Sequence, residues 1–133
     1  MIERVTATPA VRALLGRLAA RHGPLLLHLS GGCCDGSAPI CLPRGDFRLG
    51  GRDLCLGWVE ETPLCMADDT FAWWEHSEVQ LDVVEARGGG FSLEVPDGVR
   101  LVARSRLFTD EELPNLRPPV PAGTLPETCP GDV

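Results

Sequence analysis

Apolar residues recur at helical spacing near the start of the chain. Thr8 and Pro9 come before this stripe, where they suit a helix cap and a first helical residue, and Gly23 follows it as a stop. The pattern therefore predicts one amphipathic helix that covers a sheet. The stripe consists of Val11, Leu14, Leu15, Leu18 and Ala19.

Shorter apolar patterns after this helix predict mostly strands. Residues 25–29 form a continuous apolar run that is typical of a buried strand, and residues 54–60 alternate between two faces. Residues 79–83, 91–95 and 99–106 also alternate and are separated by glycine-containing turns, which predicts three consecutive strands in an antiparallel meander. Further short strands are expected at 47–49 and 64–67, and a short helix at 68–76 that residues 68–70 cap.

Together these elements predict a β-rich α+β fold, in which the N-terminal helix packs on a small antiparallel sheet or sandwich. The chain has 133 residues, which suits one domain. Residues 1–112 form the predicted globular domain. Residues 113–133 are rich in proline and are expected to form an extended tail without a core of its own.

Charge narrows the choice of partners. The formal net charge is −7, which argues against nucleic acid and anionic membranes because binding phosphate requires a basic face. No apolar run approaches the roughly 20 residues of a membrane span, and Glu3 and Arg4 interrupt any signal-peptide pattern. We therefore expect a cytoplasmic protein with reduced cysteines. A disulfide scaffold built from its six cysteines is the less favoured alternative.

The most distinctive chemistry lies directly after the first predicted strand. Residues 30–41 read Ser-Gly-Gly-Cys-Cys-Asp-Gly-Ser-Ala-Pro-Ile-Cys, which places three thiols and a carboxylate in a loop of small residues. Glycines allow such a loop to curl tightly and to bring its side chains together. This clustering indicates a site for a reaction or a metal ion.

Cys33, Cys34 and Cys41 are the leading candidate metal ligands. Thiolates bind zinc, iron and iron–sulfur clusters strongly. Adjacent cysteines rarely point at the same ion, so we expect Cys41 and one member of the pair to bind, with His76 completing a Cys/His site. The alternatives are a glycine loop with inert thiols and a surface position for His76.

Five other polar or thiol residues have open interpretations. Asp35 suits either a ligand or acid/base role or an Asx-turn, and His28 needs a polar partner, for which a backbone carbonyl is favoured over a ligand site. Cys55 and Cys65 lie in predicted strands and are expected in the core. Cys129 is interpreted most simply as a free thiol of the tail.

Two family resemblances depend on these residues. Residues 31–41, 87–94 and 104–108 resemble the signature of a small bacterial family of unknown function, over most of positions 1–112. Members of that family are often encoded beside aldehyde dehydrogenases, which implies such an enzyme as a partner.

The order of elements is more distantly similar to the HesB-like A-type iron–sulfur carriers. Those carriers have a glycine-flanked cysteine after the first strand, to which Cys33 or Cys34 would correspond. They also have a Cys-x-Cys pair near the C-terminus, where this chain has only Cys129. The resemblance implies a HesB-like fold and, less directly, iron–sulfur binding.

Three functions are consistent with the sequence. The first is a small cytoplasmic protein that binds a metal ion (iron, an iron–sulfur cluster or zinc) through the Gly/Cys loop, with a site that a homodimer could share. The second is a non-catalytic accessory protein of an aldehyde dehydrogenase. The third is a thiol-dependent enzyme that acts on small aldehydes or thiol adducts, with Cys33 or Cys34 as nucleophile.

Overall fold

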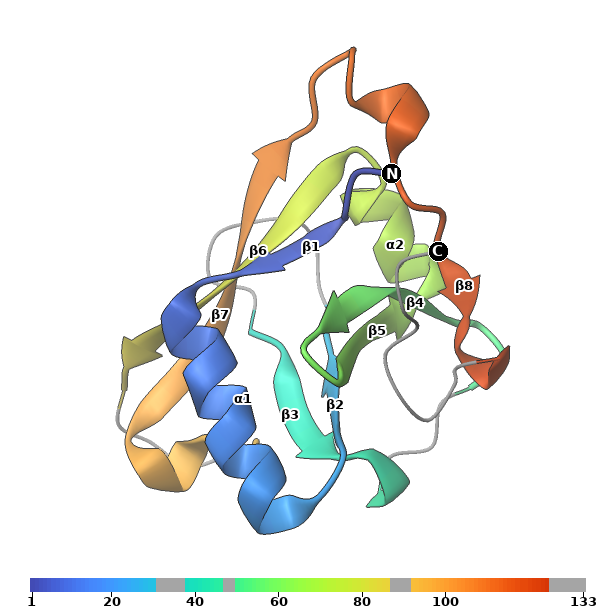
Figure 1. Cartoon of the computed structure of the whole chain (residues 1–133). Coiled ribbons are helices and arrows are strands. Elements are labelled where there is room, and N and C mark those ends of the chain that lie inside the picture. The colour runs from blue at the N-terminus through green and yellow to red at the C-terminus, as the bar shows by residue number, and fades with distance from the viewer. Residues whose placement is uncertain (31–37, 47–49, 87–91, 125–133) are drawn as a thin grey trace.

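A computed structural model describes residues 1–30, 38–46, 50–86 and 92–124 of the chain (Figure 1). Its regular elements are β1 (Val5–Ala7), α1 (Pro9–His22), β2 (Leu25–His28), β3 (Ile40–Pro43), β4 (Asp53–Val59), β5 (Thr62–Ala67), α2 (Asp68–Trp74), β6 (Ser77–Glu85), β7 (Val99–Leu107) and β8 (Val120–Pro121). The strand expected at 47–49 lies outside the described residues.

Helix α1 forms where the apolar stripe predicted it. The side chain of Thr8 caps it by accepting a hydrogen bond of 3.3 Å from the backbone N–H of Val11, and Pro9 occupies the first turn. Gly23 ends the helix with a positive φ of 79°, a conformation that glycine adopts without steric cost. The helix contacts β6 of one sheet and β2 of the other, so its buried side chains lie between them.

The strands form two sheets. One has the order β1-β6-β7, with β1 parallel to β6 and with β6 and β7 antiparallel from Ser77↔Leu107 to Glu85↔Val99. The other has the order β3-β2-β5-β4-β8, in which only β2 and β5 are parallel. The α+β class and the helix on a sheet are confirmed. Each described sheet is mixed, however, because β1 and β2 each pair in parallel with a later strand.

The strand predicted at 91–95 is wrong for its described part, residues 92–95. Residues 92–94 form a bend and a turn, and a 3₁₀ helix follows at Val95–Asp97. The carboxylate of Glu94 explains the difference, because it turns inward and accepts hydrogen bonds from the Ser92 hydroxyl and, at 3.1 Å, from the Leu101 N–H. The predicted meander is therefore a two-stranded β6–β7 hairpin joined to β1.

The main core lies between α1 and the two sheets. Leu25, Leu27 and Leu29 of the β2 segment point into it, whereas Leu26 belongs to a second cluster on the other face of the sheet. Burial on both faces explains why this segment is a continuous apolar run. Where the sheets meet, a side chain added at Gly57 would come within 3.4 Å of Val5, so β1 and β4 can approach closely.

Helix α2 begins at Asp68, whereas the sequence predicted that residues 68–70 cap it. The observed N-cap is Ala67, which makes no side-chain hydrogen bond, and Asp68 and Asp69 lie in the first turn. Carboxylates stabilise that end of a helix by opposing its dipole. Of the two adjacent tryptophans, Trp74 is fully buried while Trp73 is 68% exposed.

Residues 113–124 contact two other parts of the chain, the residues before β1 and strand β4. The backbone N–H of Ile2 donates to Asn115 at 2.7 Å, and the N–H of Arg117 donates back to Ile2 at 2.9 Å. Further along, β8 pairs with β4, and Ala122 is buried. The division of the chain at residue 112 stays a prediction, and residues 125–133 lie outside the described part.

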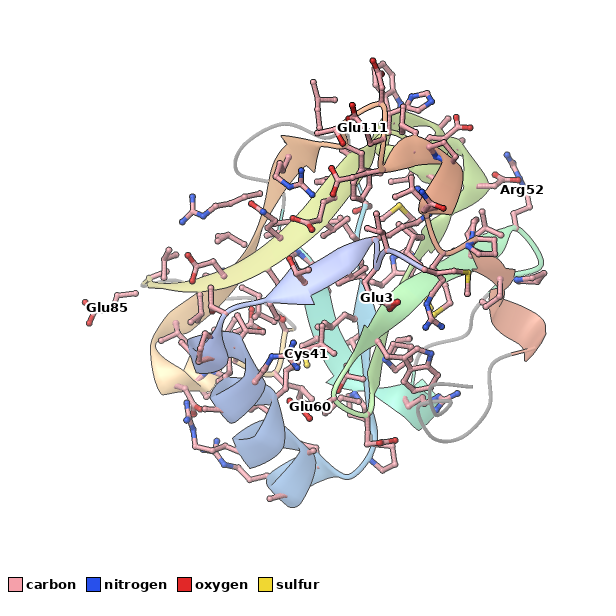
Figure 2. All side chains as sticks on the ribbon, turned by 45° about the horizontal axis from the view of Figure 1, so that its top comes forward. Glu3, Cys41, Arg52, Glu60, Glu85 and Glu111 are labelled. Atoms are coloured by element: carbon pink, nitrogen blue, oxygen red, sulfur yellow. The ribbon has the colours of Figure 1, made fainter. Side chains whose placement is uncertain are left out.

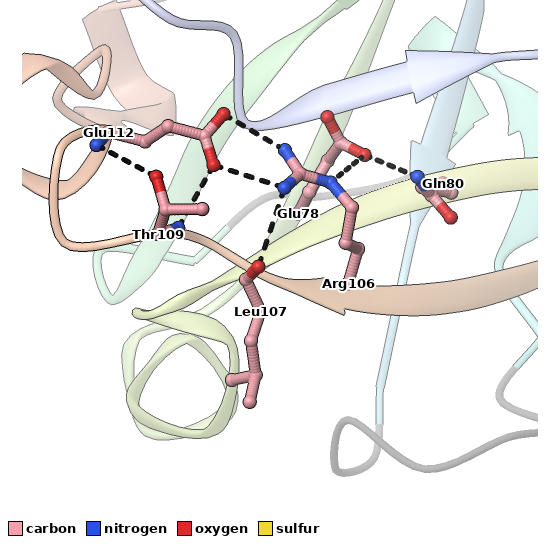
Figure 3. Close-up of polar contacts among 6 residues, drawn as sticks. All are labelled: Glu78, Gln80, Arg106, Leu107, Thr109 and Glu112. Atoms are coloured by element: carbon pink, nitrogen blue, oxygen red, sulfur yellow. Dashed lines mark hydrogen bonds and ion pairs between the residues drawn. The ribbon is translucent and has the colours of Figure 1, made fainter.

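Ion pairs and hydrogen bonds around Arg106 hold the segment that follows β7 against the sheet (Figure 3). The guanidinium of Arg106 donates to both carboxylate oxygens of Glu112, at 3.0 and 3.1 Å, and to Glu78 at 3.4 Å. The Glu112 carboxylate also accepts from the backbone N–H of Thr109. These charge-assisted contacts lower the pKa of Glu112 to about 2, with the Arg106 hydrogen bond as the largest cause.

Candidate functional site

The Gly/Cys loop is described only at its two ends. Cys33, Cys34 and Asp35 lie outside the described residues. On the incoming side, Leu29 is buried and its N–H donates to the Cys65 carbonyl at 3.0 Å. On the outgoing side the chain enters β3 at Ile40, opposite His28. Both ends of the loop are thus attached to the five-stranded sheet.

Cys41 is a core residue of β3. Its side chain is fully buried opposite Leu27, and Figure 2 shows it inside the fold, whereas Glu85 and Arg52 project from the periphery. Burial raises the pKa of its thiol to about 12, and the nearby Glu94 carboxylate adds to the effect. Without a cation beside it, this thiol stays protonated at neutral pH.

The backbone of Cys41 is held by the turn that replaces the predicted strand. Its N–H donates to the Ser92 hydroxyl at 2.8 Å, and its carbonyl accepts from the Leu93 N–H at 2.9 Å. Ser92 in turn contacts Glu94, which is 1% exposed. This buried polar group connects β3 to the residues that precede β7.

His76 lies on an exposed turn between α2 and β6. Its carbonyl accepts a hydrogen bond of 3.0 Å from Phe108, which holds the turn against the end of β7. Within the described ranges, no set of three or more His, Cys, Asp or Glu side chains could hold a metal ion. His76 and Cys41 therefore do not complete a site with any third described residue, and their role as ligands stays a prediction.

His28 has a carboxylate partner that sequence reasoning did not find. Its Nε2 lies 3.2 Å from Oδ1 of Asp53, and the two side chains are only 18% and 13% exposed. The other carboxylate oxygen of Asp53 accepts from the Gly50 N–H at 2.6 Å, so this carboxylate is held in place. The sequence hint was a polar residue in an apolar strand, but Asp53 lies 25 positions further along the chain.

A cross-strand row continues from His28 over the outer face of the five-stranded sheet. His28 is opposite Cys65, Cys65 is opposite Cys55, and Cys55 is opposite Val120. Residues directly opposite each other in neighbouring strands project to the same face. The imidazole and the two thiols therefore share the face opposite the main core.

Cys55 and Cys65 are buried, as the sequence predicted. They pack with Leu26 and Ala122, and Trp58 lies against this second cluster. The Cys55 thiol donates to the Gly57 carbonyl at 3.5 Å. A hydrogen bond between the two thiols lowers the pKa of Cys55 and raises that of Cys65, so Cys55 is the more easily deprotonated member.

Comparison with known families identifies the region that holds these features. A family model matches residues 14–107, from within α1 to the end of β7. The chain belongs to the DUF779 family. DUF779 is a domain of unknown function, and the matched part of this chain includes the Gly/Cys loop, His28 and Asp53. The expected family of unknown function is confirmed.

Neither the curated proteins nor the solved structures contain a match to this DUF779 chain. The HesB-like resemblance and the link to aldehyde dehydrogenases stay predictions. Neither helix of the described structure is long and apolar enough to cross a membrane.

Proposed function

We propose that this DUF779 chain is a metal- or iron–sulfur-binding protein whose thiolate ligands come from the Gly/Cys loop. The observation that supports the proposal is the His28–Asp53 contact of 3.2 Å at the end of β2. It provides an oriented imidazole five residues before Cys33, in a chain that clusters three thiols within nine positions. Thiolate and imidazole together are ligands suited to zinc and iron.

The role of Asp53 in this proposal is to orient the imidazole. Histidines that bind metals usually give their other ring nitrogen to a carboxylate or a carbonyl, which fixes the ring and raises its basicity. Asp53 is in position to do this for Nε2 of His28, and the Gly50 N–H holds the carboxylate. A bound ion would supply Lewis-acid or electron-transfer chemistry, and His28 together with the loop thiolates would hold it.

The ligand set then differs from the sequence expectation, which combined Cys41, one member of the Cys33/Cys34 pair and His76. The Cys33/Cys34 pair supplies the thiolate, and His28 takes the place expected for His76, because His28 is partly buried and oriented while His76 is exposed. Cys41 is the weakest thiol candidate, since its pKa of about 12 must be overcome by the bound cation itself.

Metal analysis of protein purified without oxygen tests the proposal. We expect stoichiometric iron with charge-transfer bands, or colourless zinc, in the wild type, and loss of the metal in a Cys33→Ser/Cys34→Ser variant. His28→Gln should lose most of the metal and Asp53→Asn should weaken binding by about 10–100-fold. Wild-type protein without metal would refute the function.

His76→Gln serves as the matched control, because it removes an exposed imidazole by the same change. We expect it to keep its metal. If His76→Gln loses the metal while His28→Gln retains it, the ligand set expected from the sequence is correct and the role given to His28 is wrong. The binding function itself survives that result, so the two claims are separately testable.

We infer a second role in partner binding from two exposed apolar side chains. Trp73 is 68% exposed and Leu107 is 74% exposed. Tryptophan is enriched at protein interfaces. A second copy of this chain and an aldehyde dehydrogenase are the partners expected from the sequence. A Trp73→Ala variant should lower the apparent mass of a dimer, or the recovery of the dehydrogenase, if this surface is used.

Catalysis by a loop thiol stays a prediction from the sequence. Its test is selective alkylation of Cys33 or Cys34 near neutral pH.

A further inference from the structure

Two thiols outside the Gly/Cys loop meet across neighbouring strands. Cys55 in β4 and Cys65 in β5 are direct partners in the antiparallel register, next to a β-bulge that follows Cys55. Opposite residues in such a pair have Cα atoms about 4.5–5.5 Å apart. That range falls within the roughly 4.4–6.8 Å between Cα atoms that a disulfide requires. Both side chains also project to the same face of the sheet.

The immediate surroundings bring the sulfur atoms together. The two thiols hydrogen-bond to each other, and Cys55 also donates to the Gly57 carbonyl. The Arg44 guanidinium lies over the Trp58 ring, 5.4 Å from its centroid. The hydrogen bond from Cys65 is the largest cause that lowers the pKa of Cys55, and the positive charges of Arg44 and Arg117 lower it further against the opposing effect of burial. An electropositive setting of this kind is what makes a cysteine nucleophilic.

On the side of Cys55, the two thiols are covered by the short edge strand β8. Cys55 is 3% exposed and Cys65 is fully buried, so neither is freely accessible in the closed structure. However, β8 is only two residues long, and Val120, the partner of Cys55, is itself 41% exposed. Short edge elements with few buried contacts open at low free-energy cost. Release of β8 and Ala122 would therefore give a small reagent access to Cys55.

We propose that Cys55 and Cys65 form a reversible disulfide when the protein meets a hydroperoxide. The Cys55 thiolate attacks the peroxide, an S–O bond forms as the O–O bond breaks, and hydroxide leaves and takes up a proton. The Cys65 sulfur then attacks the resulting sulfenic acid. The S–S bond forms, the S–O bond breaks, and a second water leaves with the Cys65 proton. Two thiols are thereby oxidised and one hydrogen peroxide is reduced to two waters.

The proposed disulfide uses neither the loop thiols nor Cys41, although Cys65 lies opposite His28, the proposed metal ligand, across β2 and β5. Cys41 offers a comparison within the same protein. It is also fully buried, but it belongs to the main core and its pKa is raised to about 12, so it should stay a thiol under conditions that oxidise Cys55.

The sequence allows a specific assay on the full-length wild-type protein. Trypsin cleaves after Arg52 and Arg87 and nowhere between them, so one peptide, 53–87, carries both thiols. A glutamate-specific protease then cleaves after Glu60 or Glu61, between the two cysteines. The fragments separate if the thiols are free and stay joined if they form a disulfide.

Reduced protein is treated with hydrogen peroxide, blocked with an alkylating reagent, digested with both proteases and analysed by mass spectrometry. We expect a linked pair of fragments, two fewer alkylated sites in 53–87, and return of both sites on treatment with dithiothreitol. Cys65→Ser should instead leave a sulfenic acid on Cys55 that a dimedone probe traps. Cys41→Ser should form the linked fragments as the wild type does.

Several results would overturn the proposal. One is full alkylation of Cys55 and Cys65 after peroxide treatment that oxidises the loop thiols. Another is a link from Cys55 to Cys33, Cys34 or Cys129 in place of Cys65. Loss of the linked fragments in Cys41→Ser would also contradict it. Metal binding by the loop is scored separately, so neither proposal depends on the outcome of the other.

Discussion

A substitution at Ser92 tests whether the buried hydrogen bonds among Cys41, Ser92 and Glu94 stabilise the fold. The Ser92 hydroxyl accepts the Cys41 N–H at 2.8 Å and donates to the carboxylate of Glu94, and both Ser92 and Glu94 are buried. Replacement by alanine removes both hydrogen bonds and adds no new atom that could clash. Water has little access to replace them, because Ser92 is 5% and Glu94 is 1% exposed.

The expected cost follows from the two lost contacts. A hydrogen bond between neutral groups contributes about 1 kcal/mol, and one to a charged group contributes about 1.5–3 kcal/mol. We therefore expect Ser92→Ala to lower the free energy of unfolding by about 2–4 kcal/mol. With a urea m-value of about 2 kcal/mol/M, typical of a small domain, the unfolding midpoint should fall by roughly 1–2 M.

Urea unfolding followed by tryptophan fluorescence measures this change, since Trp74 is fully buried in the folded protein. Ser30→Ala is the control. Ser30 is exposed after β2, so the same chemical change there should alter stability by less than about 0.5 kcal/mol. If Ser92→Ala also falls within about 0.5 kcal/mol of the wild type, the buried polar group does not stabilise the fold as argued here.

Three further changes test other parts of the structure. Leu27→Ala, in the fully buried centre of β2, should cost about 2–5 kcal/mol in urea unfolding, and a cost near that of an exposed site would contradict its place in the core. Thr8→Ala removes the cap of α1 and should cost about 1 kcal/mol, visible as a lower thermal midpoint. Glu112 has its pKa lowered from 4.5 to about 2 in the folded protein, so its ion pair with Arg106 stabilises the fold above about pH 4.5 and is lost as the pH falls towards 2. The difference in thermal midpoint between wild type and Glu112→Gln should therefore shrink over that range, and a difference that does not change with pH would refute the assignment.

Local patterns predicted much of the secondary structure. Helix α1 and strand β2 could each be predicted from their own residues. The helix is buried on one face, which gives an apolar stripe, and the strand is buried on both faces, which gives a continuous apolar run. The alternation at residues 91–95 was misleading, because Glu94 is a charged residue that turns inward to the Ser92 hydroxyl and the Leu101 N–H. Alternation alone does not show such a partner.

The candidate site was less predictable, because its contacts join distant parts of the chain. Asp53 reaches His28 only after β5 is inserted between β2 and β4, and no local pattern specifies that order of strands. The burial of Cys55 and Cys65 could be expected from their strands, but their direct pairing depends on the register of the β4–β5 hairpin. Thiol spacing indicated the Gly/Cys loop, and His28 ends the strand that leads into that loop, whereas His76 lies on a separate exposed turn.

The outer strands of both sheets have a consequence for the behaviour of the protein at high concentration. In the five-stranded sheet the outermost strands are β3, which ends at Pro43, and the two-residue β8, which contains Pro121. Proline has no N–H to offer an incoming strand. In the three-stranded sheet the outermost strands are β1 and β7, and β7 carries the exposed Arg104, whose charge repels a like neighbour. Strand pairing between copies through β3, β7 or β8 is thus discouraged.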